Sequence, residues 1–295
     1  MIQESVLSAI VQFIEQFTGQ PLGLLHCTSV QGGDINRSYK ITGKERSYFI
    51  KLNHAHLLDM FHSEAMGLSA LSKTTALRTP DVIGCGVAAS SAFLILEYIE
   101  LVPLQKSNQQ ALGQALAQLH QEIQPYFGWS MDNFIGHTPQ KNTATEDWAT
   151  FWCDYRLSFQ LKLAAQQGYD GKLQLLGSAL VKKLPVFFQD YRVQASLLHG
   201  DLWAGNASFD KQGTPIIYDP ACYYGDRETD IAMTELFGGF SQEFYLAYQA
   251  VWPLDAGYQQ RKSLYNLYHI LNHVNLFGVG YLAQAEQLME QLLDV

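Results

Sequence analysis

The segment LLHGDLWAGNASFDKQGTPIIYD (residues 197–219) decides the fold of this chain. It places Asp201 five residues before Asn206 and ends a short apolar run on a second aspartate, Asp219. Aspartate and asparagine are also common turn formers, so an isolated D-x-x-x-x-N would indicate surface loops. Here the pattern follows an apolar pair, residues 197–198, and precedes a β-like run, residues 215–218. These surroundings favour a functional loop over plain turns.

Phosphoryl transfer from ATP needs little covalent chemistry from a protein, but it needs three groups in place. One carboxylate accepts the proton of the attacking hydroxyl, while an amide oxygen and a second carboxylate hold magnesium ions. By analogy with the protein-kinase catalytic loop and metal-binding aspartate, Asp201 would be the base. Asn206 and Asp219 would be the metal ligands. The segment therefore predicts a kinase-type site that uses ATP and Mg²⁺.

A glycine-containing turn lies upstream, in VQGGDINRSY (residues 30–39). Gly32 and Gly33 lack Cβ atoms, so their backbone amides can approach phosphate oxygens closely, and Asn36 follows in the same loop. An ordinary Gly-Gly hairpin is the alternative explanation. Asp34 also places a negative charge close to where phosphates would lie. We predict nucleotide binding by Gly32, Gly33 and Asn36 because of the elements that follow them.

The next β-like run, SYFIKLN (residues 47–53), carries Lys51 in an apolar setting. Such a lysine usually lies at a sheet edge with its ammonium group in water. After a glycine loop it instead fits the cation that pairs with the α- and β-phosphates. Residues 60–73 have helical spacing, and Glu64 near their start is the predicted partner of Lys51. A helical glutamate is most often solvated, so this prediction depends on the position of Glu64 in the series.

The apolar strand FLILEYI (residues 93–99) would form the hinge between two lobes. Backbone groups of Glu97 and Ile99 would hydrogen-bond adenine, with Leu96 packed behind the base. A plain buried strand that ends at Glu97 is the alternative. The order of the elements favours the nucleotide site, because each follows the previous one as in a kinase.

Composition restricts the class of protein. With 295 residues, of which 47% are apolar and 13% aromatic, the chain can bury a sizeable core and does not have the composition of a disordered protein. A net charge of −9 argues against nucleic-acid binding. No apolar run approaches the length that spans a bilayer. Four scattered cysteines without a C-x-x-C pair, and no basic leader, predict reduced thiols and a cytoplasmic location.

The pattern along the chain predicts an α+β class with two lobes. Residues 1–99 would form an N-terminal nucleotide-binding lobe, with an amphipathic helix, a β-rich core and one key helix. Residues 100–295 would form a larger, mainly helical lobe with the catalytic loop, metal site and acceptor pocket. Helical spacing resumes near residue 228, which leaves no room for a long activation segment. We therefore predict a bilobal, protein-kinase-like fold with its site in the cleft.

Several further segments make the pattern more specific. They are QKN (140–142), EDW (146–148), LHGDLWAGN (198–206), DPACYYG (219–225), MTELFGGF (233–240) and YHILNHVNLFG (268–278). On these segments the chain resembles the fructosamine kinases, or ketosamine-3-kinases, of the aminoglycoside-phosphotransferase-like branch of protein-kinase-like folds. H-G-D-L-x-x-x-N marks only the wider branch, and the Tyr-Tyr-Gly, Phe-Gly-Gly-Phe and Leu-Asn-His segments give the resemblance its specificity.

The resemblance implies that ATP phosphorylates the C3 hydroxyl of a ketosamine, whether a fructosamine, ribulosamine or erythrulosamine, free or protein-bound. The unstable 3-phosphate then releases the amine, which amounts to deglycation and protein repair. Asp201 would accept the hydroxyl proton, a role worth about 10²–10⁴-fold in rate. His199 is expected to support the catalytic loop, and Asp230 to anchor a helix start or brace that loop, rather than to touch the substrate.

Four residues are candidates for contact with the acceptor. The ketosamine carries an ammonium group, so the carboxylates of Asp226 and Glu228, which follow the metal aspartate closely, are chemically suitable. Trp203 would pack on the sugar, and His273 would contribute from the C-terminal helix. A purely structural role is an equal alternative for each of them.

Two other functions stay open on sequence grounds. One is a different small-molecule kinase of the same branch, acting on an aminoglycoside, choline or a sugar, although the C-terminal motifs argue against it. The other is a nucleotide-binding regulatory protein whose turnover is incidental. The preferred sugar and the oligomeric state do not follow from the sequence.

Overall fold

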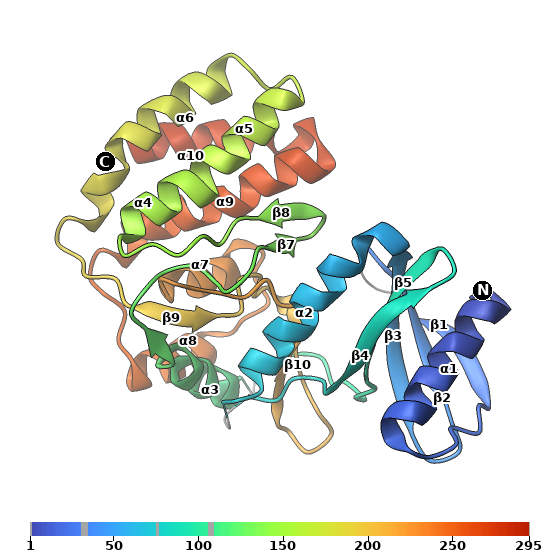
Figure 1. Cartoon of the computed structure of the whole chain (residues 1–295). Coiled ribbons are helices and arrows are strands. Elements are labelled where there is room, and N and C mark those ends of the chain that lie inside the picture. Colours follow the sequence, from blue (N-terminus) through green and yellow to red (C-terminus); the bar gives the residue numbers. More distant parts are fainter. Residues whose placement is uncertain (1, 31–34, 75–76, 106–108, 295) are drawn as a thin grey trace.

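The computed structural model describes residues 2–30, 35–74, 77–105 and 109–294 (Figure 1). Its smaller lobe contains one antiparallel sheet in the order β1-β2-β3-β5-β4. The strands are β1 (His26–Val30), β2 (Arg37–Thr42), β3 (Ser47–His54), β4 (Val82–Ala88) and β5 (Ser91–Glu97). Helix α1 (Glu4–Thr18) precedes the sheet, and α2 (Leu58–Leu71) connects β3 to β4 after a short 3₁₀ turn (Ala55–Leu57). Figure 1 shows α2 between this sheet and the larger lobe.

Strand β5 is apolar along its length because helices cover both faces of the sheet. Phe93 and Ile95 belong to the cluster that includes α1, whereas Leu94 and Leu96 belong to the cluster that includes α2. Successive side chains of a strand point to opposite faces. Lys51 on β3 pairs in register with Leu94. The strand geometry therefore places the Lys51 side chain on the face that α2 covers.

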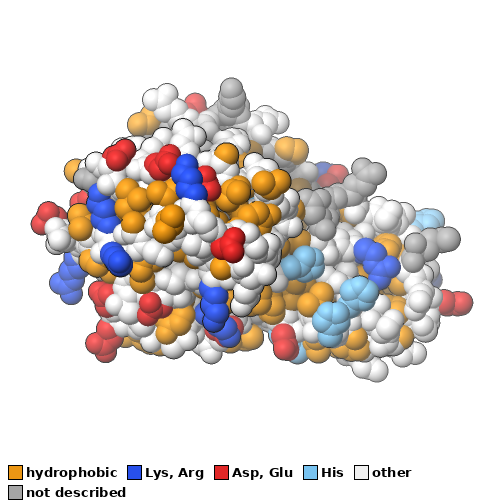
Figure 2. Space-filling view, turned by 90° about the horizontal axis from the view of Figure 1, so that it is seen from above, with side chains coloured by type: hydrophobic (Ala, Val, Ile, Leu, Met, Phe, Trp, Pro, Cys, Tyr) orange, Lys and Arg blue, Asp and Glu red, His pale blue; other side chains and the backbone are white. Residues whose placement is uncertain are grey.

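The larger lobe is mainly helical. Its helices are α3 (Gln110–His120), α4 (Trp148–Trp152), α5 (Ser158–Gln166), α6 (Lys172–Lys183), α7 (Glu228–Leu236), α8 (Gln242–Val251), α9 (Tyr258–Phe277) and α10 (Leu282–Asp294). A π-helical turn (Cys153–Leu157) joins α4 to α5, and 3₁₀ turns occur at Leu184–Phe188, Ala204–Asn206 and Val279–Tyr281. Figure 2 shows apolar side chains gathered over this lobe, with charged side chains of both signs spread among them.

Short strands in the larger lobe hold the loops of the cleft. Strands β12 (Tyr223–Gly225), β9 (Ala195–Leu198) and β6 (Ile123–Gln124) form one small sheet in that order. Strands β10 (Ala207–Phe209) and β11 (Pro215–Ile217) form a hairpin, as do β7 (Asn133–Ile135) and β8 (Thr138–Gln140). The catalytic-loop sequence thus runs from β9 to β10, and Asp219 follows β11.

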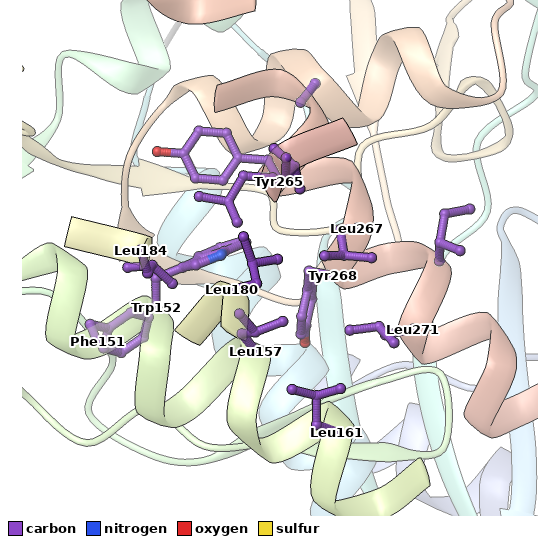
Figure 3. Packing of buried hydrophobic residues seen from close by; sticks show 14 of the residues in the cluster. Phe151, Trp152, Leu157, Leu161, Leu180, Leu184, Tyr265, Leu267, Tyr268 and Leu271 are labelled. Carbon is purple, nitrogen blue, oxygen red and sulfur yellow. The ribbon is translucent and has the colours of Figure 1, made fainter. Parts of the chain in front are cut away.

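The core of the larger lobe is aromatic and aliphatic (Figure 3). The ring centroids of Trp152 and Tyr265 are 4.9 Å apart, and both rings are buried. The guanidinium group of Arg156 is also buried, 4.1 Å from the ring centroid of Tyr223, and donates a hydrogen bond to Asn142 Oδ1 at 2.8 Å. The QKN segment is therefore tied to the helical core.

The predicted α+β class and the order of its elements are confirmed. The expected N-terminal amphipathic helix is α1, the helix that carries Glu64 is α2, and helical structure resumes at α7. The connection expected over residues 126–146 contains the β7–β8 hairpin, whose Phe134 packs with the cluster under α2. The division after residue 99 stays a prediction; it falls between β5 and α3. Within the described residues, no helix combines the length and apolar character needed to cross a membrane.

Gly113 sets the distance between α3 and α8. A Cβ atom there would lie 2.2 Å from the carbonyl oxygen of Phe244 in α8. We predict that Gly113→Ala lowers the free energy of unfolding by about 1–3 kcal/mol, because overpacking outweighs the helix propensity gained. Gly280→Ala is the control, since its Cβ would meet no atom within 4 Å. Urea unfolding compares the two variants, and equal stability would contradict this close packing.

Candidate active site

Lys51 joins three segments of the chain through its ammonium group. Its Nζ lies 2.7 Å from Glu64 Oε1 on α2 and 2.6 Å from Asp219 Oδ1 after β11. Lys51 and Glu64 are both buried. Burial alone would lower the pKa of Lys51, but the Asp219 and Glu64 carboxylates outweigh burial and raise it above its ordinary value. The lysine is therefore a fixed positive charge in the cleft.

Asp219 has an unusual backbone conformation. Its φ of 59° lies in the left-handed region, where residues with a Cβ atom are uncommon. Such conformations cost free energy and cluster at functional sites. The turn directs the carboxylate toward Lys51, while the side chain keeps 43% of its surface exposed. Asp219 is thus held by one contact and still faces the cleft.

The catalytic loop is pressed against the segment that follows Asp219. Gly200 has a φ of 82°, and a Cβ there would lie 2.1 Å from the carbonyl oxygen of Ala221. Only glycine fits this approach. The loop is fixed from the other side by Asp230 in α7, whose carboxylate accepts hydrogen bonds from the backbone N–H groups of His199 (2.7 Å) and Gly200 (2.9 Å).

His199 connects the catalytic loop to the segment between β11 and Asp219. Its Nε2–H donates to the carbonyl oxygen of Tyr218 at 2.9 Å, and its Nδ1 accepts from the backbone N–H of Asp201 at 3.3 Å. Burial lowers the pKa of His199, which keeps the imidazole neutral and suits one donor and one acceptor nitrogen. The expectation that His199 and Asp230 support the loop agrees with these contacts.

Asp201 and Asn206 lie at the two ends of one short turn. Asn206 Nδ2 donates to the Asp201 carbonyl oxygen at 2.9 Å and lies 3.4 Å from Asp201 Oδ2. This geometry leaves the amide oxygen Oδ1 as the atom that can face a cation. Burial and the negative charges of Asp219 and Asp230 raise the pKa of Asp201 to about 7, while the Asn206 amide opposes the shift.

The donor set fits a magnesium ion. Two carboxylates of the cleft, Asp201 and Asp219, repel one another, and a divalent cation would relieve this repulsion. In the described part of the chain, no cluster of three or more His, Cys, Asp or Glu side chains can hold a metal alone. Mg²⁺ often binds through one or two carboxylates together with phosphate and water oxygens. Asp219 and Asn206 would therefore share the ion with the nucleotide.

The predicted phosphate-binding glycines, Gly32 and Gly33, lie outside the described residues, and so does Asp34. Asn36 is described at the start of β2. Its Oδ1 accepts a hydrogen bond from Asn53 Nδ2 at 2.8 Å, so its side chain links β2 to the end of β3. This contact places Asn36 beside the end of the strand that carries Lys51.

One backbone group of the predicted hinge, the N–H of Glu97, is not free to bind adenine. Leu96 is buried under α2, and Ile99 is partly exposed. The backbone N–H of Glu97 already donates to the Asp81 carbonyl oxygen at 2.8 Å, which leaves the Glu97 carbonyl as its possible contact. The Glu97 carboxylate pairs with Arg78. Of the backbone groups predicted to bind adenine, the carbonyl of Glu97 and those of Ile99 therefore remain as candidates.

Trp203 and His273, the other two residues predicted to contact the acceptor, have the following surroundings. The Trp203 ring covers Gly205, where a Cβ would come within 2.2 Å of it, and 42% of its surface is exposed. His273 Nδ1–H donates to the His269 carbonyl oxygen at 2.7 Å, and its ring lies 5.2 Å from that of Phe237. Gly239 abuts Ala204, which brings the loop that follows Phe237 against the catalytic loop.

Asp226 and Glu228 do not lie in the cleft as suggested by their sequence positions. Both are buried in the larger lobe, with 1% and 0% of their surface exposed. Asp226 accepts hydrogen bonds from the hydroxyl groups of Tyr191 and Tyr265. Glu228 forms a bidentate pair with Arg261, at 2.8 and 3.0 Å. Because both carboxylates already accept hydrogen bonds from buried side chains of the same lobe, we no longer propose that they bind the acceptor.

Two supporting residues, His120 and Arg78, were not predicted from the sequence. His120 Nε2–H donates to Asp230 at 3.2 Å, while its Nδ1 accepts from Tyr248. Arg78 contacts Glu97 at the end of β5 and Asp210 in the β10–β11 turn, and so joins the two lobes behind the cleft. No local pattern marks these residues, because their partners are distant in sequence.

Comparison with known proteins agrees with this geometry. A family model described as fructosamine kinase matches residues 6–295. The chain belongs to the fructosamine kinase family. It is 45% identical over 287 residues to a probable ketoamine kinase of Synechocystis sp., covering 97% of this chain and 96% of that protein. The family assignment confirms the resemblance inferred from the motifs.

Solved structures support the same fold. The crystal structure of a putative fructosamine-3-kinase from Haemophilus somnus is similar with a TM-score of 0.88 and 29% identity, covering 96% of both chains. An aminoglycoside phosphotransferase shares the fold alone, with a TM-score of 0.65 and 16% identity over 98% of both chains. The bilobal fold predicted from the sequence, that of the aminoglycoside phosphotransferases, is confirmed.

The Lys51–Glu64 pair makes a testable contribution to stability. We predict that Lys51→Met lowers the free energy of unfolding by about 3–5 kcal/mol, because it leaves the buried Glu64 carboxylate without a cation. The double variant Lys51→Met/Glu64→Gln should recover most of this loss, since the buried charge is gone. Urea unfolding at neutral pH measures both. Equal destabilisation in the single and double variants would show that the buried charge is not the cause.

Proposed function

We propose that this kinase transfers the γ-phosphoryl group of ATP to the C3 hydroxyl of ketosamines, namely fructosamines, ribulosamines or erythrulosamines. The observation that carries the proposal is the convergence of Lys51, Glu64 and Asp219 at the cleft where Asp201 and Asn206 also lie. This arrangement occurs in a chain that belongs to the fructosamine kinase family. The acceptor is either a free ketosamine or one attached to a protein lysine.

Each side chain has a distinct role in the proposed transfer. Lys51, oriented by Glu64, binds the α- and β-phosphates as a fixed positive charge. Asp201 orients the C3 hydroxyl and accepts its proton as the oxygen attacks the γ-phosphorus. Asn206 and Asp219 would hold Mg²⁺, which neutralises charge on the phosphates when it is bound. Adenine would contact the Glu97 carbonyl and the Ile99 backbone, with Leu96 behind it.

Trp203 and His273 are proposed to hold the acceptor. The exposed Trp203 ring offers a flat surface for the sugar two residues from the base. His273 Nδ1–H donates to the His269 carbonyl, which leaves Nε2 as the ring nitrogen that can contact a ligand. Hydroxyl and ammonium groups of a ketosamine are donors that suit this nitrogen. Recognition would therefore need no additional carboxylate in place of Asp226 or Glu228.

The product explains why such an activity repairs proteins. Loss of a C1 proton and protonation of the C2 carbonyl oxygen convert the 3-phosphate into an enaminol. The enaminol expels phosphate from C3, and hydrolysis of the remaining conjugate releases the amine. We propose that this chain performs the phosphorylation in the cytoplasm and that glycated proteins or free ketosamines are its partners.

A substrate panel tests the proposed activity. We expect Mg²⁺-dependent ATP consumption with ribulose-lysine, fructose-lysine or deoxymorpholino-fructose, and NMR should locate phosphate on C3. Choline and kanamycin are the controls for the wider branch. Turnover with a control alone would overturn the ketosamine assignment, and an inert protein with every compound would overturn the enzyme assignment. Removal of Mg²⁺ with EDTA should stop turnover, and added Mg²⁺ should restore it.

Asp201 is the residue whose loss should separate chemistry from binding. We predict that Asp201→Asn lowers kcat by about 10²–10⁴-fold, because an amide cannot accept the hydroxyl proton. Calorimetry should show nearly unchanged affinity for a non-hydrolysable ATP analogue. Asp154→Asn is the matched control and should retain full activity, because Asp154 is exposed on the π-helical turn between α4 and α5. Full activity in Asp201→Asn would remove this residue from the base role.

A further inference from the structure

A groove of about 540 Å³ lies between α2 and the segment that follows Phe127 in the larger lobe. One wall is formed by helix α2. It contributes His62, Met66 and Ala70, which are spaced four residues apart, and Lys73 follows just beyond the helix end. Trp129 and Ser130 form the opposite wall. Asp201, Asn206 and Asp219 do not line this groove, so it is separate from the site described above.

The walls of the groove are mainly apolar, and one lysine, Lys73, lies among the lining residues. Met66 leaves 45% of its surface exposed, and the indole of Trp129 lines the groove while one face stacks on Tyr224, with centroids 5.5 Å apart. The ionisable groups among the described lining residues are Lys73 and His62. His62 faces Asp59, at 3.7 Å, whereas Lys73 has no carboxylate within 4.0 Å in the described parts of the chain. In a chain of net charge −9, this groove favours an anion.

Both walls are connected to the nucleotide site. The helical wall belongs to α2, whose inner face carries Glu64 and whose Gly67 packs against Pro220 and Cys222. The other wall is fixed to β12 by paired backbone hydrogen bonds between Gly128 and Tyr224, at 2.8 and 2.9 Å. A molecule that touches both walls would therefore hold α2 in the position in which Glu64 reaches Lys51.

We propose that this groove is a second ligand site, which takes a small anion with a flat apolar body and strengthens nucleotide binding. The apolar body packs between Met66 and Trp129, and the acidic head lies at Lys73. A volume of 300–1,000 Å³ with mostly apolar walls and few polar groups is typical of small-molecule sites. A ligand that contacts both walls binds best when α2 is in this position, and it would therefore favour the conformation that holds the Lys51–Glu64 contact.

Binding can be tested with two matched probes. 1-Anilinonaphthalene-8-sulfonate has a flat apolar body and one sulfonate, and N-phenyl-1-naphthylamine is the same molecule without the sulfonate. Fluorescence titration should show that Lys73→Glu weakens the sulfonate probe by about fivefold or more, as expected when an attractive charge contact becomes repulsive. Met66→Glu should weaken it similarly. The neutral probe should bind more weakly and respond little to Lys73→Glu.

Lys182→Glu is the matched control, since Lys182 is exposed in the last turn of α6 and its substitution changes the net charge equally. It should bind the sulfonate probe as the unchanged protein does. If Lys73→Glu and Lys182→Glu bind this probe equally well, the site is not this groove. If both probes bind equally tightly, the groove is an apolar docking surface and the proposed anion is wrong.

Coupling is measured by calorimetry with a non-hydrolysable ATP analogue and Mg²⁺. A saturating concentration of the sulfonate probe should raise the affinity of the unchanged protein for the analogue by about fivefold or more. Lys73→Glu should lose this gain while keeping its affinity without probe. An unchanged or lowered analogue affinity would overturn the proposed coupling. The probe titrations require no phosphoryl transfer, so failure of the ketosamine activity would leave their outcome interpretable.

Discussion

The ammonium group of Lys51 is the contact on which the arrangement of the cleft depends. It meets carboxylates from α2 and from the loop after β11, and these segments belong to different lobes. The lysine reaches them because strand alternation on β3 directs its side chain under α2, opposite Leu94. An apolar residue at position 51 would fit the sheet equally well, but it would leave both acids without a cation. The position is therefore constrained by charge rather than by packing.

The second constraint lies in the larger lobe, where one buried carboxylate orders the catalytic loop. Asp230 accepts backbone hydrogen bonds from His199 and Gly200, and His120 donates to it from α3. Although burial opposes ionisation, these donors hold the pKa of Asp230 below its ordinary value. The loop is thus fixed by a charge that never faces solvent. Asp201 can remain partly exposed because Asp230 holds the backbone of the two residues that precede it.

Local patterns predicted the residues whose roles depend on the order of elements along the chain. Lys51, Glu64 and Asp219 were predicted to act together because a strand, a helix and a turn occur in kinase order, and in the structure their side chains are in contact. The same logic failed for Asp226 and Glu228, whose sequence proximity to Asp219 suggested the cleft. Their partners, Tyr265 and Arg261, lie on α9, far along the chain. A short-range pattern cannot show whether a carboxylate has such a distant partner.

The contact between Lys51 and Asp219 also indicates which partners would change when a nucleotide binds. Under the proposed function, Lys51 pairs with phosphates and Asp219 with a cation, whereas in this structure Lys51 Nζ and Asp219 Oδ1 lie 2.6 Å apart. When nucleotide and Mg²⁺ bind, Lys51 would exchange Asp219 for the phosphates, and Asp219 would exchange Lys51 for the cation. Each group would then again face an opposite charge. Glu64, which contacts Lys51 from α2, would keep the lysine oriented during this exchange. Without this lysine, the buried Glu64 carboxylate would bear a desolvation cost before any ligand arrived.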